Sequence, residues 1–140
     1  MRVFRIKPIV EGNVEGEIVL SRTPISFLGD VDPNTGLIIA DDSDVKGIKI
    51  TDKILIIPRG RGSTVGSYIL YALRKRGLAP KAIIMVHPDP VIIAGCVIAD
   101  IPLALGLSLN YFNIIKTGDY GYLDGVREVL VVEERDIDSH

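Results

Sequence analysis

This sequence of 140 residues has little cysteine and no long hydrophobic run. Its one cysteine, Cys96, cannot form an internal disulfide, nor can it alone hold a zinc ion or an iron–sulfur cluster that needs several thiolates. Residues 1–7 lack the apolar stretch that a signal peptide requires. The longest nearly uncharged stretch, 90–110, contains Asp100, Pro102 and two glycines, which does not suit a membrane span. We therefore expect a soluble, cytoplasmic protein with no membrane partner.

An excess of charge of one sign is also missing. Sixteen basic and eighteen acidic side chains give a formal net charge of −2. Because nucleic-acid binders carry a basic excess or stripe, we expect no nucleic-acid partner. A chain of this length buries roughly two-thirds of its unfolded surface, and no repeat or linker divides it. We therefore predict one domain that spans residues 1–140.

Short runs of Ile, Val and Leu, bounded by Gly, Pro and Asp, predict several strands. The run 54–57 is wholly apolar, which is typical of a strand buried on both faces. We expect a hairpin at the end of the chain, with its turn at residues 124–125. The predicted strands are 15–20, 36–40, 54–57, 81–86, 112–115, 120–123 and 126–132.

Two helices are predicted between these strands. The first has its apolar residues at the helical period of 3.6 and ends at Gly77, with the basic run 74–76 complementing the dipole of its last turn. Asp89 and Pro90 predict the N-cap and first residue of the second helix, through Ala99. A strand–helix–strand unit over 54–86 implies a parallel pair, so we expect an α/β domain with a barrel-like sheet. The apolar face expected for the first helix is Val65, Tyr68, Ile69, Ala72 and Leu73.

A turn rich in glycine and hydroxyl groups, residues 60–64, precedes the first helix. Its glycines permit a close approach of the backbone to a ligand, and the helix start favours a carboxylate or phosphate. The pattern also fits a plain N-cap made by Ser63, and it lacks the lysine of a Walker loop. A helix dipole lowers a pKa by about one unit, which does not ionise serine near neutral pH. A catalytic serine here needs a positive neighbour, from Arg59, Arg61 or another chain, so the chain is incomplete as an enzyme.

The remaining candidates favour structural roles. His87 and Asp89 flank a proline, and we interpret His87 as a turn residue. Cys96 lies in an apolar helix and is expected in the core. Residues 41–44 contain three aspartates, and we interpret them as a solvated turn and not a metal site. No Ser–His–Asp set or metal-ligand spacing is present in the sequence.

Three motifs, at residues 24–36, 55–67 and 88–92, resemble those of the small subunit of aconitase X-type dehydratases. The resemblance covers about residues 11 to 104, and Leu28 and Asp30 replace a tryptophan and a glycine of its first motif. It implies the swivelling β/β/α domain of the aconitase superfamily. It also implies a large subunit that holds an iron–sulfur cluster through its own cysteines, with no cluster ligand on this chain.

The activity that this resemblance implies is the removal of water from a small molecule, (R)-5-phosphomevalonate. The product is trans-anhydromevalonate 5-phosphate, in an archaeal mevalonate route to isoprenoids, and the cluster iron acts on the departing hydroxyl. Two alternatives remain. A related pair of subunits dehydrates cis-3-hydroxy-L-proline, and a swivelling module without catalytic function would only bind a partner or ligand.

The same resemblance assigns roles in the glycine turn. In the aconitase pattern a Gly-x-Gly-Ser turn presents a serine as the base that removes a proton, and Ser63 occupies that place. The pattern continues with Ser-Arg-Glu, whereas residues 64–66 here are Thr-Val-Gly, so one arginine contact is lost. Substrate binding is expected, by position, of Arg61, Gly62, Thr64 and Ser67.

Overall fold

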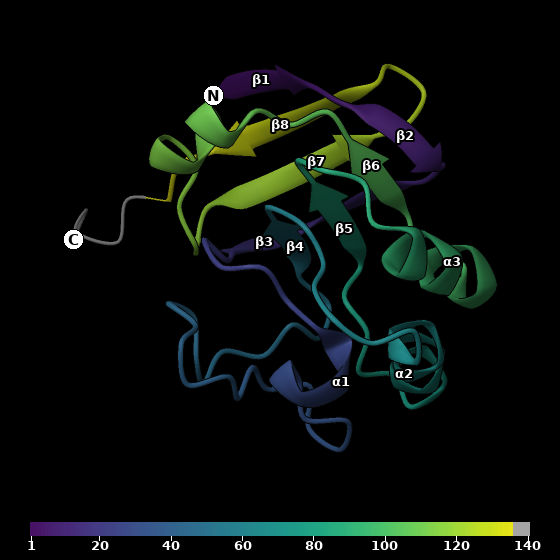
Figure 1. Cartoon of the computed structure of the whole chain (residues 1–140). Helices are drawn as coiled ribbons and strands as arrows, with labels where there is room; N and C mark the ends of the chain where they lie inside the picture. Colours follow the sequence, from purple (N-terminus) through teal and green to yellow (C-terminus); the bar gives the residue numbers. More distant parts are fainter. Residues whose placement is uncertain (136–140) are drawn as a thin grey trace.

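The computed structural model describes residues 1–135, and its strands form one curved sheet (Figure 1). The order of strands across the sheet is β1-β8-β7-β3-β4-β5-β6-β2. Neighbouring strands from β3 to β6 are parallel, and the other neighbours are antiparallel. The strands are β1 (Arg2–Arg5), β2 (Lys7–Val10), β3 (Asn13–Leu20), β4 (Ile54–Ile57), β5 (Ala82–Met85), β6 (Leu103–Leu105), β7 (Tyr120–Asp124) and β8 (Val129–Glu133).

The amino-terminal segment gives the sheet its barrel-like form. β1 and β2 lie at opposite ends of the strand order, yet only Ile6 separates them in the chain. The first half of this segment pairs with β8 and the second half with β6, both antiparallel. One continuous stretch of chain therefore joins the two edges of the sheet, which leaves fewer exposed strand edges.

Helices cover the parallel strands from one side (Figure 1). α2 (Gly66–Lys75) connects β4 to β5, and α3 (Pro90–Ala99) connects β5 to β6. A tight turn, α1 (Phe27–Asp30), packs against α2, and a 3₁₀ helix (Leu109–Asn113) follows β6. The small residues Gly66 and Gly95 let α2 and α3 approach closely, since a Cβ at Gly95 would lie 3.0 Å from Ser67 Cα.

Two hydrophobic cores lie on the two faces of the parallel strands. Ile54 and Ile56 of β4 face the inside of the sheet, where they pack with residues such as Phe4 and Phe112. Leu55 and Ile57 alternate with them and pack under the helices. The wholly apolar run 54–57 is therefore a strand buried on both faces, as predicted.

Several sequence predictions are confirmed. The predicted strand–helix–strand unit is β4–α2–β5 with a parallel pair, and the carboxyl-terminal hairpin is β7–β8. Gly77 ends α2 with a φ of +72°. Asp89 caps α3, where its Oδ1 accepts hydrogen bonds from the backbone N–H groups of Val91 at 2.9 Å and Ile92 at 3.1 Å.

Other predictions were wrong. Residues 36–40 form only isolated bridges, because Ile38 is buried within a long loop between β3 and β4. Residues 112–115 belong to the 3₁₀ helix and the turn after it, where Phe112 and Ile115 are buried three positions apart. The buried face of α2 is also displaced, since Tyr68 is 71% exposed and Val65 is exposed. The buried residues of α2 are Gly66, Ser67, Leu70 and Leu73, of which only Leu73 belongs to the expected face. Gly66, Ser67 and Leu70 lie against α3.

The assignment of residues 1–140 to one domain stays a prediction, and its last five residues lie outside the described part of the chain. Within residues 1–135, no helix is both long enough and apolar enough to cross a bilayer.

Cys96 of α3 is buried in the core, and burial raises the pKa of its thiol to about 12. At pH 8 such a thiol is ionised in about one molecule in 10,000, and the thiolate is the reactive form. We expect no alkylation of the native protein by iodoacetamide over several hours, and complete alkylation in urea, as measured by intact mass. Rapid labelling of the native chain would contradict this burial.

Candidate functional site

The structure brings the three sequence motifs together at the carboxyl end of β4. Ile25 and Gly60 form a parallel bridge, in which Ile25 N donates to Arg59 O at 3.3 Å and Arg61 N donates to Ile25 O at 3.1 Å. His87, which directly precedes the third motif, donates from its backbone N to Pro58 O at 2.9 Å. The chain at residues 58–61, which leads into the glycine turn, is therefore held on both sides by backbone hydrogen bonds.

Asp89 contacts this turn directly. A Cβ at Gly60 would lie 2.7 Å from Asp89 Oδ2 and 2.6 Å from Ile92 Cδ1, so only glycine fits there. Gly62 has a φ of +95°, a conformation that glycine adopts without strain. Glycine is therefore required for a different reason at each position: a close contact leaves no room for a Cβ at Gly60, and the backbone conformation favours glycine at Gly62.

Ser63 is half-buried and lines a small depression together with Gly62 and Asp89. Its Oγ accepts a hydrogen bond from Val65 N at 3.2 Å, just before α2 begins at Gly66. The Ser63 hydroxyl therefore lies at the depression, beside the first turn of α2. The dipole of a helix start does not ionise a serine by itself.

The guanidinium of Arg61 is paired with two aspartates. It donates to Asp42 from Nη1 at 3.0 Å and Nη2 at 3.2 Å, and from Nε to Asp30 at 3.2 Å. The hydrogen bond from Arg61 lowers the pKa of Asp42, and the same bond raises the pKa of Arg61. Because the pKa of Asp42 is lowered, this contact persists at neutral pH and is lost only as the pH falls through that lowered pKa.

These contacts correct one interpretation and extend another. The loop 41–44 is not merely a solvated turn, because Asp42 holds Arg61 and Asp44 Oδ1 accepts from Arg22 N at 3.1 Å. Asp30, which departs from the family motif, pairs with Arg61 and also accepts from Ser26 N at 2.8 Å. The sequence carries no local signal for the contact between Asp42 and Arg61, since 19 positions separate them.

The other expected substrate-binding residues differ in their surroundings. Gly62 and Thr64 are exposed beside Ser63. Ser67 is buried against Gly95 of α3, and its Oγ donates to Thr64 O at 3.4 Å. Ser67 therefore supports the start of α2, and its hydroxyl does not face the depression lined by Ser63 in this structure.

No three His, Cys, Asp or Glu side chains among residues 1–135 lie together in a way that could hold a metal ion. Cys96, a residue of α3, is buried in the hydrophobic core and has no other cysteine beside it. These residues therefore do not fit an iron–sulfur cluster.

We expect Arg61 and Asp30 to stabilise the folded chain as a pair. In a double-mutant cycle of Arg61→Gln and Asp30→Asn, a charge-assisted hydrogen bond of this kind gives a coupling free energy of about 1 kcal/mol. The measurement is urea unfolding at pH 7, with Asp32→Asn as the control, since Asp32 only accepts from a backbone N–H of its own turn. Additive effects of the two substitutions would show that the pair does not hold the turn.

A model of the aconitase X swivel domain matches residues 3–132, so the chain belongs to this family. It is 50% identical over 130 residues to the phosphomevalonate dehydratase small subunit of Pyrococcus furiosus, with 92% of this chain and 95% of that protein covered. The same subunit of Methanosarcina acetivorans is 44% identical, over 85% of this chain and 83% of that protein.

A solved structure agrees with the fold. The crystal structure of Thermococcus kodakaraensis aconitase X, in its holo-form, superposes with a TM-score of 0.89 and 42% sequence identity. The match covers 96% of this chain and all of that chain. The expected swivelling domain with a barrel-like sheet is therefore confirmed.

Proposed function

We propose that this chain is the small subunit of a dehydratase that removes water from (R)-5-phosphomevalonate. Ser63 carries the proposal, because it lies in the glycine turn where all three family motifs meet. The similar small subunits from Pyrococcus and Methanosarcina, named for this activity, support the same substrate. The product is trans-anhydromevalonate 5-phosphate.

Ser63 acts as the base in this proposal. Its Oγ takes a proton from the carbon beside the substrate carboxylate, the hydroxyl leaves the neighbouring carbon, and a double bond forms between the two carbons. The proton and the hydroxyl together make the water that is lost. A base positioned in this way contributes about 10² to 10⁴ to the rate.

The charges around Ser63 indicate that a second chain completes the site. Asp30 and Asp42 neutralise Arg61, and Asp89 adds a further negative charge beside the turn. A positive group is needed to lower the pKa of a serine. The depression that Ser63 lines holds Arg61 and Asp89 but no surplus of positive charge among the described residues, and Arg59 lines a separate cavity. We therefore assign that group, together with the iron–sulfur cluster, to the large subunit.

Contact with the large subunit covers the surface around the turn in this proposal. The apolar side chains of Val65 and Tyr68, which follow the turn directly, are exposed. Apolar side chains of this size are typical of the buried centre of a subunit interface. The substrate contacts assigned to Arg61, Gly62, Thr64 and Ser67 remain part of the proposal, and the orientation of Ser67 makes its contribution indirect.

The test is an assay of the complex, formed by co-expression with its large subunit and purified without oxygen. Dehydration of phosphomevalonate and of cis-3-hydroxy-L-proline is followed in parallel by the appearance of product. We expect turnover of the phosphorylated substrate and none of the amino acid. Turnover of hydroxyproline alone would overturn the assignment of phosphomevalonate as the substrate. The absence of any turnover by an intact complex would favour a non-catalytic binding module.

A further inference from the structure

A cavity of about 470 Å³ lies beside the glycine turn and is separate from the depression that Ser63 lines. Arg22, Arg59 and His87 line it, together with two asparagines of the 3₁₀ helix. Its remaining lining is apolar, and no carboxylate among residues 1–135 lines it. The lining includes Pro24, Pro58, Leu109, Asn110, Phe112 and Asn113.

The three basic residues occupy equivalent positions in the fold. Each follows the carboxyl end of a parallel strand by two residues: Arg22 follows β3, Arg59 follows β4 and His87 follows β5. These strands are immediate neighbours in the sheet, so the three side chains gather at one edge. In α/β barrels as in open α/β sheets, ligands bind at the carboxyl ends of the parallel strands.

Arg59 has its positive charge available to a ligand. Within residues 1–135 no carboxylate oxygen lies within 4.0 Å of it, in contrast to the doubly paired Arg61. Arg22 has a weaker competitor, since its Nε lies 3.9 Å from Asp44. A guanidinium with free donors matches the geometry of a phosphate or carboxylate group.

From this geometry we propose that the cavity binds the phosphate group of the substrate, an inference that rests on the proposed function. Each of the three motif regions contributes residues to both the cavity and the depression at Ser63, one or two positions apart in the chain. The cavity is lined by Pro24, Arg59 and His87, and the depression by Ile25, Arg61 and Asp89. Two residues of chain span at most about 7 Å. Five bonds, about 6 Å, separate the phosphorus of phosphomevalonate from the carbon that loses its proton, a length comparable with this two-residue spacing.

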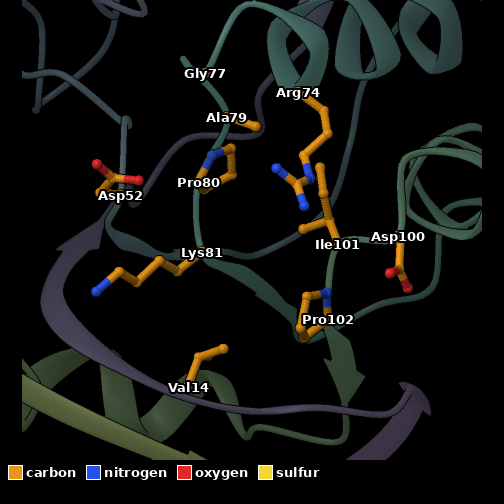
Figure 2. Close-up of a pocket in the computed structure, with 10 residues that line it drawn as sticks. All are labelled: Val14, Asp52, Arg74, Gly77, Ala79, Pro80, Lys81, Asp100, Ile101 and Pro102. Atoms are coloured by element: carbon orange, nitrogen blue, oxygen red, sulfur yellow. The ribbon is translucent and has the colours of Figure 1, made fainter.

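The opposite edge of the sheet supplies a matched control. A second cavity of about 320 Å³ lies there, lined by Arg74 from the end of α2 together with Lys81, Asp52 and Asp100 (Figure 2). Its charges have both signs, and Lys81 Nζ already donates to Glu15 O at 2.9 Å. Arg74→Gln therefore removes an arginine charge without touching the proposed phosphate site.

The experiment compares Arg59→Gln, Arg59→Lys and Arg74→Gln in the assembled complex. We expect Arg59→Gln to raise KM for phosphomevalonate about 10- to 100-fold with kcat changed less than threefold, and Arg59→Lys to restore part of the loss. Inorganic phosphate should compete with the substrate, and Arg59→Gln should weaken that inhibition by a similar factor. Arg74→Gln should leave both constants within twofold of the wild type.

If KM for phosphomevalonate is unchanged in Arg59→Gln, the proposed phosphate site is wrong and the proposed function remains intact. If acetate inhibits as strongly as phosphate, and its inhibition depends equally on Arg59, the cavity binds the substrate carboxylate and the phosphate site is again wrong. If the complex turns over only hydroxyproline, phosphate binding is measured directly by ³¹P line broadening on wild type and Arg59→Gln. Broadening that Arg59→Gln abolishes supports an anion site, and broadening that is unchanged overturns it.

Discussion

Replacement of Ser63 by alanine is expected to lower kcat of the assembled complex about 1,000-fold, within the range for loss of a general base. This corresponds to about 4 kcal/mol of transition-state stabilisation. KM should change little, because the hydroxyl acts on the proton and not on the charged ends of the substrate. Steady-state assays of purified complexes, with cluster content checked by absorbance, give both constants.

Ser43→Ala is the matched control for this substitution. Ser43 Oγ accepts a hydrogen bond from Val45 N at 3.1 Å, the same type of contact that Ser63 Oγ makes with Val65 N at 3.2 Å. Loss of this contact alone should therefore change kcat less than threefold. If both variants lose activity equally, or Ser63→Ala keeps its activity, Ser63 serves only to shape the turn.

Isotope exchange distinguishes a serine that acts as the base from a serine that only stabilises the turn. In deuterated water, a serine base that returns its proton exchanges hydrogen at the reacting carbon of the substrate. We expect this exchange in the wild type and its loss in Ser63→Ala, even where the variant complex binds substrate normally. Exchange at the wild-type rate in the variant would assign the base to another group.

The sequence was informative where local pattern and tertiary environment agree. The all-apolar run 54–57, the glycine turn and Gly77 mark one strand–helix–strand unit, and each interaction that defines it is local or between adjacent elements. The strands β1 and β2 were not predicted, because their partners lie far away along the chain: Arg2 of β1 pairs with Val132 of β8, and Lys7 of β2 pairs with Leu105 of β6. Val3 is 61% exposed and Phe4 is buried in this segment, and without knowledge of its partners the segment gives no clear alternation.

The same distinction applies to the site. Ser63 and Asp89 could be singled out from a turn and a cap, which are local features. The partners of Arg61 and the gathering of Arg22, Arg59 and His87 depend on which strands are neighbours in the sheet, and a single sequence does not specify that. Ser67 was expected to present its hydroxyl to a ligand together with Ser63 and Thr64. It is buried instead, because α3 approaches α2 closely at this position.

Gly60→Ala is expected to damage stability and activity together. The added methyl group would lie 2.6 Å from Ile92 Cδ1 and 2.7 Å from Asp89 Oδ2, closer than folded proteins allow. Overpacking of this kind costs about 1–3 kcal/mol of unfolding free energy. Displacement of the turn by about 1 Å also moves Ser63 away from the reacting carbon, which costs about 100-fold in kcat.

Two further variants separate crowding at Gly60 from backbone strain. Gly47→Ala meets no heavy atom within 4 Å but has a φ of +87°, so it should cost about 1 kcal/mol of stability with kcat unchanged. Ile92→Val removes the Cδ1 atom that the new methyl group meets, so the double variant should recover part of the stability and of kcat lost in Gly60→Ala. Urea unfolding and steady-state assays measure both quantities. Equal losses in the single and double variants would show that crowding against α3 does not position the glycine turn.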